Sequence, residues 1–143
     1  KDDKFPIGGS KVLKKSKMDA VTVISAGLTV FEALKAYEEL KKEGISIRII
    51  DAYSVKPIDK QGIVREVSKT DGNIVVVEDH YANGGLGDAV ALALEGHARI
   101  VHLAVKELPR SGEPGELMDK YGISTPHIIN AVKNLVGKRK TRR

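Results

Sequence analysis

The sequence predicts an α/β protein in which a mostly parallel β-sheet carries helices on both faces. Short runs of β-branched residues alternate with stretches of helical periodicity, which is the pattern of repeated strand–helix–strand units. The run 74–77, Ile-Val-Val-Val, has no polar alternation, as expected for a strand buried on both faces. A glycine-rich crossing at 84–87 then leads directly into a helical pattern.

The expected elements can be placed along the chain. We expect strands at 11–15, 20–25, 45–51, 74–77 and 100–105, and helices at 29–43, from Pro57 or Asp59 onward, at 86–95, at 116–121 and from Thr125 onward. The lysines of 11–15 discourage further pairing. We therefore expect that short strand at a sheet edge, where we allow for an antiparallel direction.

Local signals mark the ends and inward faces of the helices. Thr29 with Glu32 fits a capping box, and Gly44 fits the left-handed position after that helix. Thr125 before Pro126 fits the N-cap of the last helix. The expected inward residues are Val30, Ala33, Leu34, Tyr37 and Leu40; Ile63, Val64 and Val67; Leu86, Ala89, Val90, Ala93 and Leu94; and Ile128, Ile129, Val132 and Leu135.

Length and composition fit one domain with an aliphatic core. The chain has 143 residues, of which 41% are hydrophobic and only 4% aromatic. It has no cysteine, which excludes disulfides, zinc–thiolate sites and cysteine nucleophiles and is compatible with a reducing compartment. We divide it into a linker at 1–9, a domain at 10–137 and a basic tail at 138–143. No apolar run reaches the ~20 residues of a membrane span.

The positive charge is concentrated at the end of the chain. The formal net charge is +5, and five basic residues within 138–143 account for all of it. We interpret this tail as a solvated terminus that aids solubility. A tail that binds nucleic acid is the weaker alternative, because no basic stripe continues into the expected fold.

Candidate functional residues gather around the strand 74–77. Glu78, Asp79 and His80 are expected where that strand ends. They could form an acid–base group, or their carboxylates could cap the next turn or pair with a neighbouring domain. Gly84, Gly85 and Gly87 follow. They could expose N–H groups to an anion at the helix start, or simply allow close packing, with Asp88 offsetting the helix dipole. We favour close packing.

The other motifs give no convincing active site. The glycines match neither the dinucleotide fingerprint nor the nucleotide P-loop. His97, His102 and His127 lack metal-ligand spacing, and His102 is expected to pack within its strand. Arg110 and Ser111, in the breaker-rich loop 108–115, could contact a phosphate or make an interdomain contact.

Several segments resemble one enzyme family. VTVISAGLTVFEALKA, DAYSVKPID, VEDHYANGGLGDAV and HLAVKELPRSGEPGELMDKYGI, in this order, resemble the C-terminal domain of transketolase, nearest to the animal-type enzymes. The resemblance runs from about Phe5 to Val136. The same domain type ends the β subunit of pyruvate dehydrogenase and 1-deoxyxylulose-5-phosphate synthase, but HYANGGLG and LPRSG favour transketolase.

The resemblance implies a three-layer α/β/α domain whose five-stranded sheet has an antiparallel first strand. It also implies a cytoplasmic, homodimeric parent enzyme that uses thiamine diphosphate and Mg²⁺ or Ca²⁺. Such enzymes transfer a two-carbon ketol unit from a ketose phosphate to an aldose phosphate in the pentose phosphate pathway. The family's G-D-G diphosphate motif is absent here, so no catalytic, cofactor-binding or metal-binding residue is assigned.

The role implied for this chain is structural. It would stabilise the dimer and pack against the cofactor-binding domains of the same enzyme, through Glu78, Asp79, His80, the three glycines and the loop 109–112. Two alternatives stay open: a protein-docking module like that of the 2-oxo acid dehydrogenases, and a regulatory module that binds an anion or nucleotide at the glycine crossing. We expect no nucleic-acid or membrane partner.

Overall fold

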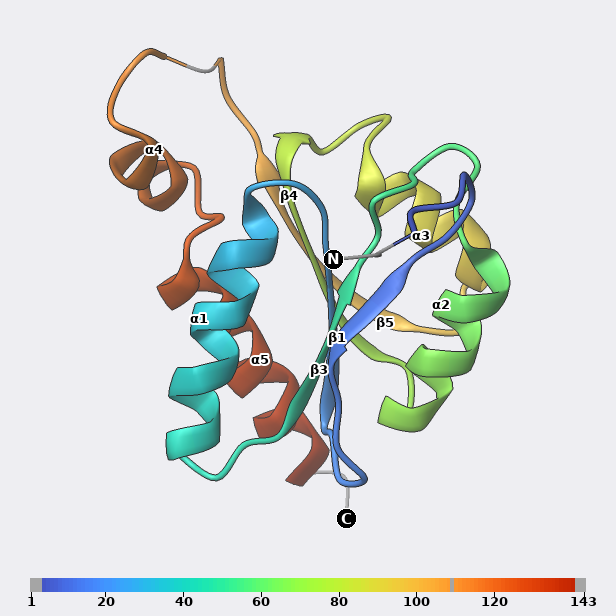
Figure 1. Cartoon of the computed structure of the whole chain (residues 1–143). Helices are drawn as coiled ribbons and strands as arrows, with labels where there is room; N and C mark the ends of the chain where they lie inside the picture. Colours follow the sequence, from blue (N-terminus) through green and yellow to red (C-terminus); the bar gives the residue numbers. More distant parts are fainter. Residues whose placement is uncertain (1–3, 109, 141–143) are drawn as a thin grey trace.

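The computed structural model describes residues 4–108 and 110–140, which form a three-layer α/β/α structure (Figure 1). Its strands are β1 (Lys11–Lys14), β2 (Val21–Ser25), β3 (Ile47–Asp51), β4 (Asn73–Tyr81) and β5 (Arg99–Val105). Its helices are α1 (Thr29–Lys42), α2 (Lys60–Val67), the 3-10 helix η1 (Ser68–Thr70), α3 (Leu86–Leu94), α4 (Pro114–Lys120) and α5 (Thr125–Lys140).

The sheet confirms the predicted fold class. Its strand order is β1-β3-β2-β4-β5, with β1 antiparallel to β3 and every other pair parallel. The lysine-bearing β1 lies at one edge, as expected. Because β2, β3, β4 and β5 are parallel, their carboxyl ends lie along the same side of the sheet, which we call the carboxyl edge.

Two apolar clusters hold the layers together. Helices α1 and α5 cover one face of the sheet, and α2 and α3 cover the other (Figure 1). On the first face Val75 and Val77 of β4 pack with Leu40 and Ile128; on the second, Val76 packs with α2 and α3. Alternate residues of one strand thus enter different clusters, which explains why β4 contains the unbroken apolar run 74–77.

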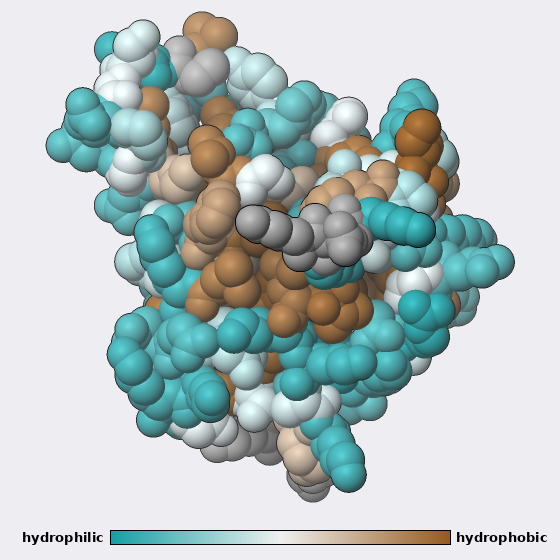
Figure 2. Space-filling view, in the orientation of Figure 1, coloured by the Kyte–Doolittle hydropathy of each residue, from teal (hydrophilic) through white to brown (hydrophobic). Residues whose placement is uncertain are grey.

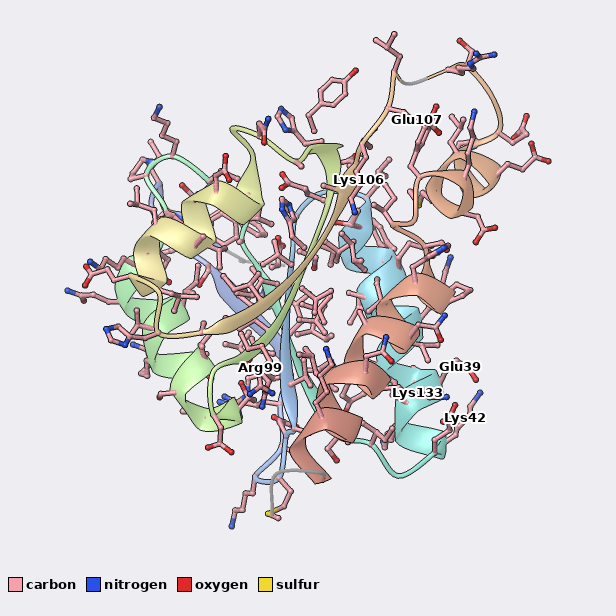
Figure 3. The ribbon with its side chains drawn as sticks, turned by 180° about the vertical axis from the view of Figure 1, so that it is seen from behind. Glu39, Lys42, Arg99, Lys106, Glu107 and Lys133 are labelled. Carbon is pink, nitrogen blue, oxygen red and sulfur yellow. The ribbon has the colours of Figure 1, made fainter. Side chains whose placement is uncertain are left out.

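Figure 3 shows the α1–α5 face from behind, with Lys133 of α5 beside Glu39 and Lys42 of α1. Lys133 Nζ also forms an ion pair, 2.6 Å long, with an Oε atom of Glu43, the residue that follows α1. In the same view Arg99 marks the start of β5, while Lys106 and Glu107 follow its other end.

The helix faces were predicted correctly in most positions. Ile63, Val67, Leu86, Val90 and Leu94 are all buried, as are Val30, Ala33, Leu40, Ala93, Ile128, Val132 and Leu135. Leu34, Tyr37, Ala89 and Ile129 are partly buried. Val64 is a wrong prediction, because it is 42% exposed on the outer side of α2.

Both predicted cap interactions, at the starts of α1 and α5, are wrong, because the side chains involved have other hydrogen-bond partners. The Thr29 hydroxyl donates to the carbonyls of Ala26 and Val77 and does not cap α1. Glu32 accepts from the backbone N–H and the hydroxyl of Thr125, at 2.9 and 2.7 Å. Thr125 is therefore the first residue of α5 rather than its N-cap.

Other local signals were read correctly. Gly44 has φ +76°, the left-handed conformation expected after α1. Asp59 is the N-cap of α2, where its carboxylate accepts from the backbone N–H of Gly62 at 2.9 Å. Helix α4 starts at Pro114, two residues before its predicted start. The predicted linker and domain boundaries are not tested by these elements, although α5 continues through Lys140.

Candidate functional site

The candidate site is the crossing from β4 to α3 at the carboxyl edge. Strand β4 continues to Tyr81, so Glu78, Asp79 and His80 lie within it. Our prediction that the strand ends at these residues is therefore wrong. The pairing with β5 is irregular there: Val77 is opposite Leu103 and Tyr81 opposite Val105, so β4 uses four residues where β5 uses two. Irregularities of this kind redirect side chains, and they are frequent beside functional sites.

Glu78 occupies the centre of the crossing and is only 3% exposed. Its two carboxylate oxygens accept hydrogen bonds from the backbone N–H groups of Leu86, at 2.6 Å, and Gly87, at 2.9 Å. His102 Nε2 lies 2.6 Å from the same carboxylate. A buried negative charge is thus matched by the free N–H groups of a helix start and by an imidazole.

Two glycines make room for this arrangement. A Cβ on Gly85 would lie 2.1 Å from Glu78 Oε2, and one on Gly87 would lie 2.2 Å from the His102 ring. Either methyl group would displace the carboxylate or the ring. Gly85 and Gly87 are therefore required for close packing, the interpretation that the sequence favoured over a site for an external anion.

A third N–H group of the crossing also has an acceptor within the chain. Gly84, at φ +79°, donates its backbone N–H to the Asp88 carboxylate at 2.6 Å. Glu78 and Asp88 together accept from three backbone N–H groups of the crossing. An added phosphate would lie beside these two carboxylates and be repelled by them.

Asp79 and His80 face outward. Both are exposed, and His80 Nδ1 lies 2.9 Å from the carbonyl oxygen of Tyr81. They do not join Glu78 in one acid–base group, because Glu78 points into the fold. At the same edge, burial raises the pKa of Asp51 at the end of β3, although the charge of Lys11 acts in the opposite direction.

An apolar hollow lies beside the crossing, between the segment before α2 and the exposed side of α3. Its volume is about 560 Å³. It is lined by Val55, Lys56, Pro57, Ile58, Lys60, Gly84, Gly85, Asp88, Ala89, Leu92, Ala93 and Glu95. Leu92 is 80% exposed at this hollow. We call it the carboxyl-edge hollow, and its aliphatic lining suits an apolar side chain better than a charged ligand.

Arg110 and Ser111 do not join the crossing. They lie in the loop before α4, on the other side of the sheet from α3 in both ribbon views (Figures 1 and 3). There the backbone N–H of Arg110 donates to the Tyr121 hydroxyl at 2.7 Å. Pro109, the first residue of the predicted contact loop, lies outside the described residues.

The sequence analysis missed the partnership of Glu78 with His102. Val76 is paired with His102 across β4 and β5, and Glu78 follows Val76 by two residues, which returns a strand to the same face. The available signal was a glutamate directly after the apolar run 74–77 and a histidine within the run 100–105. Pairing them required the knowledge that β4 and β5 are adjacent and in that register.

Comparison with known proteins identifies the family. The model of the transketolase C-terminal domain matches residues 10–128. The chain belongs to this family. It is 50% identical over 139 residues to mouse transketolase-like protein 2 and 48% identical over 139 residues to human transketolase, in each case over 96% of this chain. It spans only 22% of the length of either relative.

Solved structures agree with this transketolase C-terminal domain assignment. A split-gene transketolase, an inactive beta4 tetramer, superposes with a TM-score of 0.85 at 34% identity, over 95% of this chain and 45% of that one. Campylobacter jejuni transketolase superposes with a TM-score of 0.67 at 19% identity, over 89% of this chain and 18% of that one, which shows the shared fold.

Among residues 4–108 and 110–140, no group of three or more His, Asp or Glu side chains is placed to hold a metal ion. Over the same ranges, no helix has the length and apolar character needed to cross a bilayer.

Proposed function

We propose that this chain is the structural, dimer-supporting C-terminal domain of a thiamine-diphosphate-dependent transketolase. The parent enzyme would transfer a two-carbon ketol unit from a ketose phosphate to an aldose phosphate, in the cytoplasm, as part of the pentose phosphate pathway. The observation that carries the proposal is the family match over residues 10–128, together with relatives named transketolase.

The cofactor would be held by other domains of the parent. A diphosphate at the crossing would have to compete with Glu78 and Asp88, which already accept from the N–H groups of Gly84, Leu86 and Gly87. The sequence also lacks the G-D-G diphosphate motif. In the assembled enzyme, thiamine diphosphate and its Mg²⁺ or Ca²⁺ would supply the chemistry, while this chain would contribute a rigid packing surface.

The carboxyl edge is the surface we propose for contact with the cofactor-binding domains. It combines the outward groups Asp79 and His80 with the carboxyl-edge hollow and the exposed Leu92. An apolar side chain of a neighbouring domain would fill the hollow. The polar residues at the rim of the hollow would pair with polar groups of that domain. We keep Arg110 and Ser111 as a separate, second contact on the α4 side.

A further apolar surface supports association with another domain or subunit. Figure 2 shows hydrophobic surface gathered over β1 and around the start of α1. Phe5, Leu28 and Phe31 are each more than half exposed. Contiguous apolar surface of this kind is typical of protein interfaces, and we propose it for the dimer.

The other two functions receive less support. The internal hydrogen bonds of the crossing argue against a regulatory anion or nucleotide at that place. A docking module for an acyltransferase core draws support only from the shared domain type. Retention of this chain on an immobilised acyltransferase core would favour that alternative.

The decisive experiment is a ketol-transfer assay on this chain joined to, or co-expressed with, its cofactor-binding domains. We expect activity only when both parts are present, and calorimetric titration of the chain alone with thiamine diphosphate and Mg²⁺ should give no binding heat. Saturable binding to the chain alone, or no complementation of activity, would contradict the proposal.

Matched substitutions test the proposed contact surface. Leu92→Asp places a charge at the carboxyl-edge hollow, and Met18→Asp places one at a residue that is 83% exposed in the β1–β2 turn. Burying a charge at an interface is costly, so Leu92→Asp should weaken association and lower activity by at least about tenfold. Met18→Asp should leave both within about twofold of wild type. Equal effects would show that the hollow makes no contact.

A further inference from the structure

Another hollow lies near the amino ends of the parallel strands, opposite the carboxyl edge, and the proposed function does not use it. It is lined by Lys15, Ser16, Lys17, Arg48 and Lys69 and has a volume of about 480 Å³. These residues come from the β1–β2 turn, from β3 and from η1. The turn is at the lower end of the sheet in Figure 1. We call this feature the cationic hollow.

Arg48 forms the buried wall of the cationic hollow. It is 3% exposed, and its guanidinium donates to Asp19 at 3.0 Å and to Glu66 at 2.5 Å. It also donates to the carbonyl oxygen of Ser16 at 3.2 Å. Its Nε has no partner among the described residues. This guanidinium therefore fixes the turn, β3 and α2 relative to one another and leaves one donor unmatched.

The lysines at the mouth make the hollow positive. Lys69 pairs with Glu66 at 2.7 Å. Within the described ranges, neither Lys15 nor Lys17 has an ion pair. The lining thus carries four cationic side chains, and two neighbouring carboxylates, Asp19 and Glu66, offset only half of that charge.

We propose that the cationic hollow binds a phosphate oxyanion, either inorganic phosphate or the phosphate of a small phosphomonoester. Lysine ammonium groups bind phosphate as point charges, and the two unpaired lysines would supply mobile donors around a rigid wall. A charge near −2 matches the excess positive charge of the lining. The inference goes beyond the proposed function and is independent of it, because the cationic hollow and the carboxyl edge lie at opposite ends of the parallel strands.

The test is an NMR titration of this chain with inorganic phosphate, with ionic strength held constant by sodium chloride, because salt screens exposed charges. We expect saturable shifts in the amide signals of Ser16, Lys17 and Lys69. Glucose 6-phosphate, titrated in the same way, separates the two sources of the phosphate group. Saturable shifts of these signals with either compound support the site, and shifts with neither overturn it.

Matched double variants assign any binding to the hollow. Lys15→Ala with Lys17→Ala removes the unpaired lysines and should weaken phosphate binding by at least about tenfold. Lys41→Ala with Lys106→Ala makes the same charge change at exposed positions elsewhere and should keep the dissociation constant within about twofold. Binding that survives the first pair, or that falls equally in both, would overturn the proposal.

Discussion

The buried carboxylate of Glu78 offers the sharpest test of how the crossing is built. Glu78→Gln keeps the shape of the side chain and removes its charge. In the native chain each carboxylate oxygen accepts one backbone N–H group from the start of α3, at 2.6 and 2.9 Å. A Gln amide has only one oxygen. One of the two N–H groups must then face an NH₂ donor.

The magnitude follows from these contacts. A buried donor left without an acceptor costs about 1–3 kcal/mol. Loss of a negative charge at a helix start costs roughly a further 0.3–1 kcal/mol. We therefore expect the free energy of unfolding to fall by about 2–3 kcal/mol, which lowers the Tm of a chain of this size by about 5–10 °C.

The assay is urea unfolding of this chain at pH 7, followed by circular dichroism, with a thermal scan beside it. Asp79→Asn is the matched control, because it makes the same chemical change at the next residue, where the side chain is exposed. The control should stay within about 0.5 kcal/mol of wild type. If Glu78→Gln is equally harmless, the carboxylate does not stabilise the helix start and our account of the crossing is wrong.

Two further predictions concern a glycine and an acid. Gly87→Ala should lower the free energy of unfolding by about 1–3 kcal/mol in the same urea assay, because the added Cβ meets the His102 ring. Gly115→Ala is the control. Its Cβ would lie in open space within α4, so this change should be neutral or slightly stabilising. Burial tends to raise the pKa of Glu66, but the hydrogen bond and charge of Lys69 and the charge of Arg48 outweigh it and hold that pKa below its ordinary value of 4.5. As the pH falls, the Glu66 carboxylate protonates first in the unfolded chain, so its contribution to the free energy of unfolding is present above about pH 4.5 and is lost below it. Glu66→Gln should therefore flatten the dependence of that free energy on pH between about pH 5 and pH 3. An unchanged slope would contradict this assignment.

Much of the fold was predictable because local signals and global arrangement agree. Runs rich in β-branched residues located the strands, and a short lysine-bearing strand was correctly placed at the edge. Gly44 marked a helix end through its left-handed backbone, and Asp59 marked a helix start through a hydrogen bond to Gly62, three residues further on. Such features can be read from sequence because their causes lie within a few positions.

The errors share the opposite cause. Thr29 and Glu32 have the spacing of a capping box, but Glu32 meets Thr125, which is 93 residues away. Glu78 was expected at a strand end, but the irregular pairing with β5 carries the strand onward and turns that carboxylate toward His102. Side chains that can satisfy either a local or a distant group take the partner that the packed fold presents.

The internal pairing at the crossing has a consequence for assembly. Polar groups at a surface normally lose bound water when a partner covers them, and mobile groups also lose conformational freedom. Here Glu78 and Asp88 already hold the N–H groups of Gly84, Leu86 and Gly87 in place. This part of the surface would meet a neighbouring domain preorganised, so association there should proceed as the docking of nearly rigid bodies, with little ordering of the backbone on contact.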